Sequence, residues 1–450
     1  MLTSLRAHLR PTLALALPIM TSFAGHMIVV VTDNIMISQY DVTQFAASVF
    51  ATSVFMIPMI TGITFGMGLT PLVGKANGEG DTERIGVLLK NGLVLNGLLA
   101  LLLLAVLLLS LPFLPMMKQS PDVLRHAVPF LTIIAFSIVP MTLFVSMKQF
   151  ADGLMDTKAA MYFTLVADAL NVVGNYLLVF GNFGFPEMGA NGSALSTLVA
   201  RIFCCVGFAI YLFTSKRYGH ITQLARAARV RLAELSHIAR MSIPTSLQGI
   251  MEVGAFAVGS IMMGALGTKE LAAHQIALGL ASFTFMMSNG TAVAGSIRVS
   301  NFLGEQRYGD MRRAGFAALG ISLVFMGCTA LLFILLRNIL PLMYTDDAAV
   351  IAIASVLFIY AGAFQIFDGM QVVMMNALRG IQDVRVPTII AFVGYWLVAL
   401  PVGYLGAFTF GLREHGIWLG YLCGLAVAAL LLLWRYSIRS AAVVRNRGLV

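Results

Sequence analysis

Three acidic residues stand inside long apolar stretches of this 450-residue sequence. Asp368 follows AGAFQIF and precedes GMQVVMMNA, and the neighbours of Asp33 and Glu252 are also mostly apolar. An ionised Asp at the centre of a membrane helix costs roughly 2.5–3.5 kcal/mol, so such a residue is usually paired, protonated or open to a polar cavity. Each carboxylate is therefore a candidate for reversible binding of a proton or a cation. The alternative is a polar group that locks two helices together.

A polar stripe occurs in VADALNVVGNYLL, where Asp168, Asn171 and Asn175 stand at i, i+3 and i+7. This spacing places all three side chains on one helical face. Amides in hydrocarbon need partners, so the stripe either joins helices or lines a cavity. Arg201, in the next apolar segment, offers a structural explanation for Asp168, because a buried ion pair would neutralise both charges.

His26 lies seven residues before Asp33 and shares its face of the first apolar segment. Its side chain titrates close to neutral pH in the absence of perturbation, which makes it a possible accessory group for proton transfer. A hydrogen-bonded structural histidine is the interpretation we favour.

The cysteines all fall in apolar segments and predict buried free thiols, without disulfides or a metal site: Cys204, Cys205, Cys328 and Cys423.

The elements that position these residues follow from composition. Hydrophobic residues make up 59% of the chain and charged residues 11%, against about 25% charged residues in soluble domains. Each apolar segment exceeds the roughly 20 residues that a helix needs to span the hydrocarbon, and none alternates as a barrel strand does. The sequence predicts an all-α integral membrane protein with about twelve spans: 11–39, 45–74, 86–114, 125–150, 158–181, 189–214, 235–265, 270–302, 313–344, 348–378, 386–412 and 414–439.

The net charge of +9 reflects basic residues in alternate short connections. They do not cluster with aromatic residues, so we expect no nucleic acid partner. An excess of Lys and Arg on one side indicates the cytoplasmic side of a membrane. We therefore expect a multi-pass protein of the bacterial cytoplasmic (inner) membrane with both termini cytoplasmic. The opposite connections hold few basic residues: Lys118, Arg125, Lys269, Arg337 and Arg413.

The second half of the chain repeats the first. Pro18 matches Pro244 at an offset of 226 residues, and GDTERIG (80–86) lies over GDMRRAG (309–315) after a short insertion. Six helices per half is an even number, so the repeats should be parallel and related by an axis along the membrane normal. In that architecture the substrate site lies between the halves and access alternates by rocking.

Three parts follow from the repeat: a first lobe of six helices over 1–214, a basic cytoplasmic linker over 215–234 and a second lobe over 235–450. The linker sequence LARAARVRLAEL could form an amphipathic helix on the inner leaflet, or serve only as a solvated connector. The membrane carboxylates have no acidic counterpart at the matching positions of the other half, which favours a role in a binding site over a role in holding the helices together. Their opposite positions hold Gly259 for Asp33, Met141 for Asp368 and His26 for Glu252.

Several stretches carry a family resemblance in collinear order along nearly the whole chain. The sequence resembles the multidrug and toxic compound extrusion (MATE) family, and most closely its NorM-like branch. This resemblance implies a two-lobed transporter, not an enzyme, that exports small cationic amphipathic compounds in exchange for sodium ions or protons. We expect a monomer in the lipid bilayer, with no cofactor besides the coupling ion. The stretches include VTDNIMI (31–37), LVGKANGEGD (72–81), FADGLMDTK (150–158), LNVVGNYLLVFG (170–181), LAAHQIAL (271–278) and FDGMQVVMMNALRG (367–380).

The resemblance also implies site residues. The cation-binding carboxylates of the second lobe fall on Glu252 and Asp368, where the resemblance implies a sodium site, and that of the first lobe falls on Asp33. Asn171 and Asn175 would be the amide partners of Asp33. Related sequences often have a tyrosine shortly before the aspartate that matches Asp368, whereas this chain has Phe364 there and lacks that hydroxyl.

The residue chemistry agrees with this interpretation. A dehydrated carboxylate favours its neutral form unless a cation or donor compensates, so it can exchange a proton for a cation. The 26 Met and 30 Phe offer an adaptable apolar surface with cation–π contacts. No G-x-x-x-x-G-K-[ST] sequence occurs, which argues against an ATP motor.

Two alternatives stay open at this point. A lipid-linked oligosaccharide flippase of related architecture would need several deep basic residues for its anionic substrate, whereas only Arg201 lies deep in a segment. An integral-membrane enzyme would gather its carboxylates or histidines on one helix or loop, whereas these carboxylates stand on separate helices.

Overall fold

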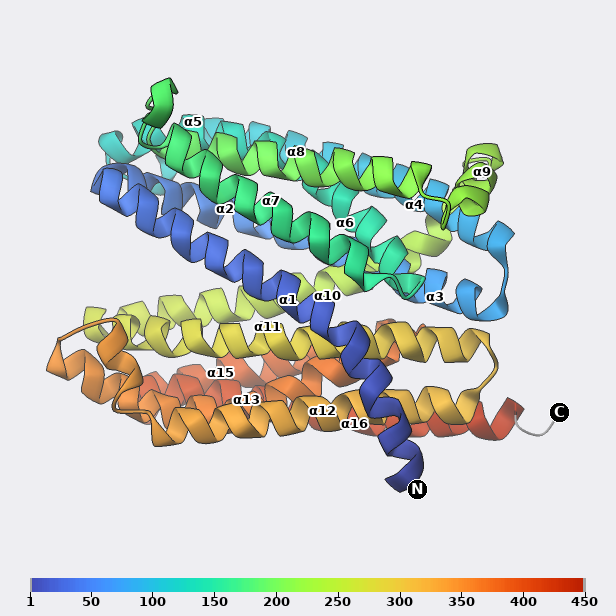
Figure 1. Cartoon of the computed structure of the whole chain (residues 1–450). Coiled ribbons are helices and arrows are strands. Elements are labelled where there is room, and N and C mark those ends of the chain that lie inside the picture. The colour runs from blue at the N-terminus through green and yellow to red at the C-terminus, as the bar shows by residue number, and fades with distance from the viewer. Residues whose placement is uncertain (1, 448–450) are drawn as a thin grey trace. The chain divides into compact units, whose positions relative to one another are not determined.

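The computed structural model describes residues 2–447, and every regular element in them is helical (Figure 1). Twelve helical stretches are long and apolar enough to cross a membrane. This confirms the all-α prediction with twelve spans. The physical reason is that hydrocarbon offers no partner to backbone N–H and C=O groups, so each spanning segment must satisfy them internally.

The first half of the chain contains six spans, two of them interrupted. Its helices are α1 (Leu2–Tyr40), α2 (Val42–Gly66), α3 (Leu69–Glu79), α4 (Thr82–Ser110), α5 (Pro121–Phe136), α6 (Ile138–Gly153), α7 (Thr157–Leu178) and α8 (Ala190–Thr214), with short 3₁₀ turns at η1 (Leu111–Met117) and η2 (Asn182–Gly184).

The second half follows a short connecting helix, α9 (Gly219–Ala227). Its elements are α10 (Leu232–Leu266), α11 (Thr268–Gly304), α12 (Tyr308–Leu335), η3 (Leu340–Met343), α13 (Ala348–Gly380), α14 (Arg385–Phe392), η4 (Val393–Ala399), α15 (Leu400–Tyr404), η5 (Leu405–Thr409) and α16 (Arg413–Arg447).

Acidic residues in the connections mark where helices begin. The side chain of Asp41 accepts a hydrogen bond of 2.7 Å from the backbone amide of Gln44 at the start of α2, and Asp81 accepts one of 2.9 Å from that of Arg84 in α4. Such N-caps satisfy backbone donors that have no partner within the helix.

The predicted span 45–74 consists of two helices because the chain bends at Gly68. A Cβ atom built on Gly68 would lie 2.6 Å from the Cα atom of Ser242 in α10. Only glycine permits this close approach, and the backbone conformation at Gly68 itself remains helical, with φ of −66°. The interruption therefore brings α10 against the junction of α2 and α3.

The eleventh span also departs from a uniform helix. The predicted segment 386–412 contains two π-helical stretches, η4 and η5, separated by the short helix α15. The helix α15 packs against α16. π-helical turns are frequent at functional sites because they rotate side chains out of the regular register. Here the first of them carries Tyr395.

The chain forms two compact units. One comprises Thr21–Ser246, and the other comprises the residues up to Met20 together with Leu247–Val450. The sequence-based boundaries at 214 and 235 differ from this division because α1 and α10 are each divided between the units.

Candidate cation sites

Asp368 is buried in the middle of α13, with 4% of its surface exposed. Its Oδ1 atom has no hydrogen-bond partner among the described residues. The adjacent Gly369 permits close packing, since a Cβ atom there would lie 2.9 Å from the hydroxyl of Ser322 on α12. A buried carboxylate oxygen without a partner is costly, so this position is suited to a bound proton or cation.

Glu252, on α10, interacts electrostatically with Asp368. Two carboxylates that share one buried region repel each other when both are ionised, and a cation between them removes the repulsion. The structure therefore brings together the two residues predicted for the second-lobe site. Glu252 also interacts electrostatically with Arg379, near the end of α13, so a permanent positive charge lies within its range.

Tyr395 adds a hydroxyl to this region. It is buried in the π-helical stretch η4 and interacts electrostatically with both Glu252 and Asp368. Phe364 stands one turn before Asp368 and makes an edge-on contact with Phe256 at 6.1 Å between ring centroids. The hydroxyl that the sequence lacks at position 364 is thus offered by another helix. Tyr395 was not predicted as a site residue from the sequence, because the predicted span 386–412 gave no sign of the π-helical stretch that contains it.

Amides extend the polar groups along α13 on both sides of Asp368. The Oε1 atom of Gln365 accepts hydrogen bonds from Thr284 at 2.5 Å and from Thr329 at 3.1 Å. The side chain of Gln371, one turn after Asp368, faces the hydroxyl of Tyr395. These residues fix the helices around the carboxylate and place several oxygen atoms in one buried region.

His274 of α11 lies in an aromatic group of the same unit. Its Nε2 atom is 3.1 Å from the hydroxyl of Ser260, and its ring stacks on Tyr421 and meets Trp418 edge-on. Its Nδ1 atom has no hydrogen-bond partner among the described residues. His274 stands in the stretch LAAHQIAL (271–278) but was not predicted as a candidate from the sequence.

The amide partners predicted for Asp33 surround it. The side chain of Asn175 donates a hydrogen bond to Oδ1 of Asp33. With its amide oriented to satisfy its neighbours, Asn171 donates to the same oxygen at 2.9 Å and accepts from the hydroxyl of Thr197 at 3.0 Å. The structure thus joins α1, α7 and α8 through one carboxylate, because the i, i+4 spacing of the two asparagines presents both amides to α1.

Arg201 does not form the ion pair with Asp168 that was one interpretation of these two residues. Its Nη1 atom donates to the hydroxyl of Ser137 at 2.6 Å, and its guanidinium lies over the ring of Phe55 at 5.3 Å. The described residues include no ion pair of Asp168 with any cation, and Oδ2 of Asp168 has no hydrogen-bond partner there. Arg201 interacts electrostatically with Asp33 and with His26.

We expect Asp168→Asn to leave the yield of folded protein and its thermal midpoint close to those of the wild type, because no ion pair is lost. The measurement is size-exclusion chromatography of the detergent-solubilised protein followed by a thermal ramp. A large drop in folded yield would instead indicate that Asp168 pairs with Arg201 in the membrane, since breaking a buried pair typically costs about 3–5 kcal/mol.

Two arginines near the carboxyl-terminal ends of their helices are buried inside the protein. Arg298 of α11 is 5% exposed and Arg379 of α13 is 6% exposed. Arg298 donates to the backbone carbonyl of His8 at 2.7 Å, and Arg379 donates to Gln248 at 3.0 Å. Both cations are therefore held by groups of the protein itself, so they do not favour an anionic substrate.

No group of three or more His, Cys, Asp or Glu side chains within residues 2–447 is arranged to hold a metal ion. A sodium ion prefers several hard oxygen ligands. Around Asp368 these would be the two carboxylates, the Tyr395 hydroxyl and the amide oxygens of α13. This donor set suits a weakly held alkali cation better than a tightly bound transition metal.

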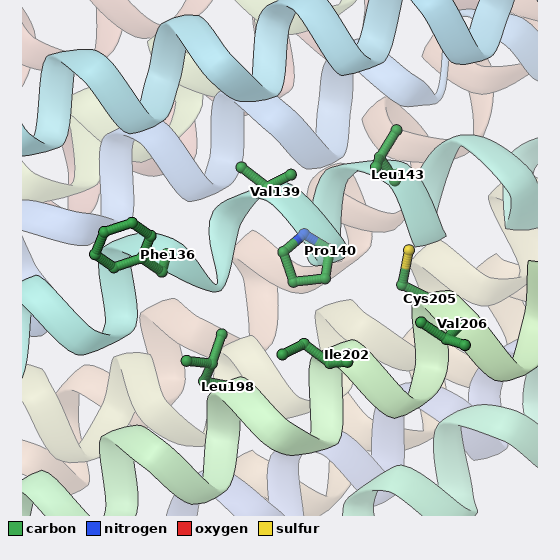
Figure 2. A pocket seen from close by; sticks show the side chains of 8 residues that line it. All are labelled: Phe136, Val139, Pro140, Leu143, Leu198, Ile202, Cys205 and Val206. Atoms are coloured by element: carbon green, nitrogen blue, oxygen red, sulfur yellow. The ribbon is translucent and has the colours of Figure 1, made fainter.

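An apolar groove lies elsewhere, between α6 and α8 (Figure 2). Its volume is about 540 Å³, and its lining side chains come from α6, from α8 and from the last residue of α5. None of the predicted site residues lines it, so it is not a cation site. Its lining consists of Phe136, Val139, Pro140, Leu143, Leu198, Ile202, Cys205 and Val206.

The family model MatE matches the chain twice, over residues 18–177 and 244–405. The chain belongs to the MatE family. The second match begins 226 residues after the first, which is the offset of the internal repeat. MatE proteins related to this chain are transporters, and this confirms the expectation that it is not an enzyme.

Curated relatives and solved structures agree with this family. A "Probable multidrug resistance protein NorM" of Rhizobium meliloti is 34% identical over 434 residues, covering 95% of this chain and 93% of the relative. The corresponding protein of Xanthomonas axonopodis is 32% identical, covering 96% and 94%. The crystal structure of the eukaryotic MATE transporter AtDTX14 superposes with a TM-score of 0.87 at 18% identity, covering 98% and 99%.

Proposed function

We propose that this MatE protein exports cationic amphipathic drugs or toxic compounds across the bacterial cytoplasmic membrane, in exchange for an inward flow of sodium ions or protons. The names of its relatives, which describe multidrug resistance proteins, support the class of substrate. The observation that carries the coupling is Asp368, a buried carboxylate with an unpartnered oxygen beside Glu252 and Tyr395.

The chemistry of exchange follows from the cost of buried charge. With Asp368 and Glu252 both ionised and no cation bound, the region carries unbalanced negative charge in a medium of low dielectric constant. Binding of a sodium ion or a proton removes that charge, and release restores it. A conformational equilibrium that exposes the carboxylates alternately to each side would then couple cation entry to substrate exit.

Asp33, Asn171 and Asn175 would form the second coupling site. The two amides donate to the carboxylate, which lowers the cost of its ionised form. His26 and Asp168 are possible accessory groups on the same helices. Either ion is compatible with this donor set.

We favour sodium over a proton because the oxygen ligands near Asp368 come from several helices. In proteoliposomes, an inward sodium gradient at constant pH should drive drug export, and Asp368→Asn should remove the sodium dependence. The measurement is the rate of fluorescent-cation transport at fixed membrane potential. Transport that follows an imposed pH gradient and ignores sodium would assign the coupling to protons instead.

Orientation provides an independent test of the same proposal. Single cysteines placed at both termini and in the 215–234 linker should be unreactive toward an impermeant maleimide in intact cells, because the basic connections should be cytoplasmic. Cysteines in the connections near Lys118 and Asp346 should react. Labelling of an amino-terminal cysteine from outside would contradict the proposed orientation.

A further inference from the structure

Side chains of α4 form hydrogen bonds with backbone atoms of the connection between α8 and α10. The Nζ atom of Lys90 donates hydrogen bonds to the carbonyl oxygens of Arg226, at 3.1 Å, and Ala228, at 2.6 Å. These bonds engage the last carbonyls of α9, where a helix has no internal donors and where its dipole favours a cation. The end of the connecting helix is therefore fixed by a side chain from a membrane span.

The next residue of α4 fixes the chain beyond α9. The Nδ2 atom of Asn91 donates to the carbonyl oxygen of Arg229 at 3.4 Å, and its Oδ1 atom accepts from the backbone amide of Arg231 at 3.1 Å. Asn91 is fully buried. Both contacts use backbone atoms of the connection, so the side chains of Arg229 and Arg231 take no part in holding the fold.

The apolar side of α9 packs against α4. Thr222 and Ala225 are buried, and a Cβ atom on Gly86 of α4 would lie 3.0 Å from the backbone nitrogen of Ala225. The apolar face of α9 therefore packs against α4 and not against lipid, although the sequence pattern alone also allowed packing on lipid. The segment that follows α9 faces outward.

That segment alternates basic and apolar side chains. Arg229 and Arg231 are exposed and form no ion pair with any residue in the described part of the chain. Val230 is 46% exposed and Leu232 is 82% exposed, immediately before the apolar run of α10. We call these four residues the linker surface.

We propose that the linker surface binds the headgroup of an anionic phospholipid, with Arg229 and Arg231 at the phosphate and Val230 and Leu232 at the level of the glycerol backbone. Two features support a lipid over a soluble anion. The surface adjoins the end of a membrane span, and its apolar side chains would gain nothing from inorganic phosphate. Basic side chains beside a spanning helix are attracted to anionic lipids by roughly 1 kcal/mol each, which is about fivefold in affinity.

Lipid binding at the linker surface requires only that the protein is inserted in a bilayer, and it does not depend on which substrate is transported. Its test uses the purified full-length protein and native mass spectrometry, with phosphatidylglycerol and phosphatidylcholine of equal chain length as separate probes. We expect phosphatidylglycerol to bind more tightly. The double variant Arg229→Gln, Arg231→Gln should weaken its binding on the order of 25-fold, because two charges are removed.

The matched control is Lys118→Gln, Arg125→Gln, which removes two exposed charges, one from the connection before α5 and one from the beginning of α5. It should leave phosphatidylglycerol binding unchanged. A thermal midpoint equal to that of the wild type will show that both variants are folded, as expected when only backbone atoms of the linker surface contact α4.

Three outcomes would overturn the proposal. The first is equal binding of the two lipids, and the second is that the control variant weakens phosphatidylglycerol binding as much as the double arginine variant does. The third is displacement of bound phosphatidylglycerol by inorganic phosphate at comparable concentration. The last would assign the arginines to a soluble anion. Loss of lipid binding with retained drug transport would support the lipid site while leaving the proposed function intact.

Discussion

Asp368→Asn is expected to reduce drug export at least a hundredfold while the protein still inserts and folds. The amide keeps the volume of the side chain but cannot carry a negative charge, so the alternation between a charged and a neutralised state is lost. Glu252→Gln should have a similar effect, because its charge acts on the same buried region. The measurement is the initial rate of efflux of a fluorescent cation, divided by the amount of folded protein in the membrane.

Asp347→Asn is the matched control for Asp368→Asn. Asp347 lies at the amino-terminal end of the same helix, where it caps α13 by accepting a hydrogen bond of 2.8 Å from Ala349, and pairs with Lys269. The backbone hydrogen bond from Ala349, and after it the contact with Lys269, hold the pKa of its carboxyl below its usual range, so it is ionised at neutral pH. Asparagine also caps helices well, and we expect transport within about twofold of the wild type. If Asp368→Asn and Glu252→Gln exported drugs at the wild-type rate, the two carboxylates would have only a structural role.

Gly420→Ala is expected to lose most of its folded protein. A Cβ atom at this position of α16 would lie 2.4 Å from the carbonyl oxygen of Ala399 and 2.6 Å from the Cα atom of Gly403. Both obstacles are backbone, so no side-chain rotation can relieve the clash. Overpacking of this kind typically costs about 1–3 kcal/mol or more. The yield of monodisperse protein in detergent and its thermal midpoint are the measurements.

Gly327→Ala in α12 provides the comparison for Gly420→Ala. No atom lies within 4 Å of the Cβ that it would add, so we expect no loss of yield and no lower midpoint. The contrast isolates close helix contact from the general effect of removing a glycine. Close approach of small residues is a common way for membrane helices to associate, because lipid offers no hydrophobic driving force. Equal yields for the two variants would mean that α16 does not pack against α15 and η4 in this way.

Local chemistry explains why the site formed by Asp33, Asn171 and Asn175 was predictable from the sequence. The positions of Asn171 and Asn175 on one face of α7 follow from helical periodicity alone, and their need for a partner follows from burial. The family resemblance identified Asp33 as that partner, and the structure joins the three side chains. A pairing of Asp168 with Arg201 was suggested only by their places in neighbouring apolar segments, and such a position does not fix which way a side chain points around its helix.

The sequence by itself determined the all-helical membrane class, the twelve spans and the internal repeat. These depend on composition and periodicity, which act within each segment. Only the tertiary structure decided that the hydroxyl of Tyr395 lies within electrostatic range of Asp368 and Glu252, because the three residues come from different helices. The structure likewise decided that Arg201 turns to Ser137. Such contacts join helices far apart in the chain, and their geometry depends on how whole helices pack.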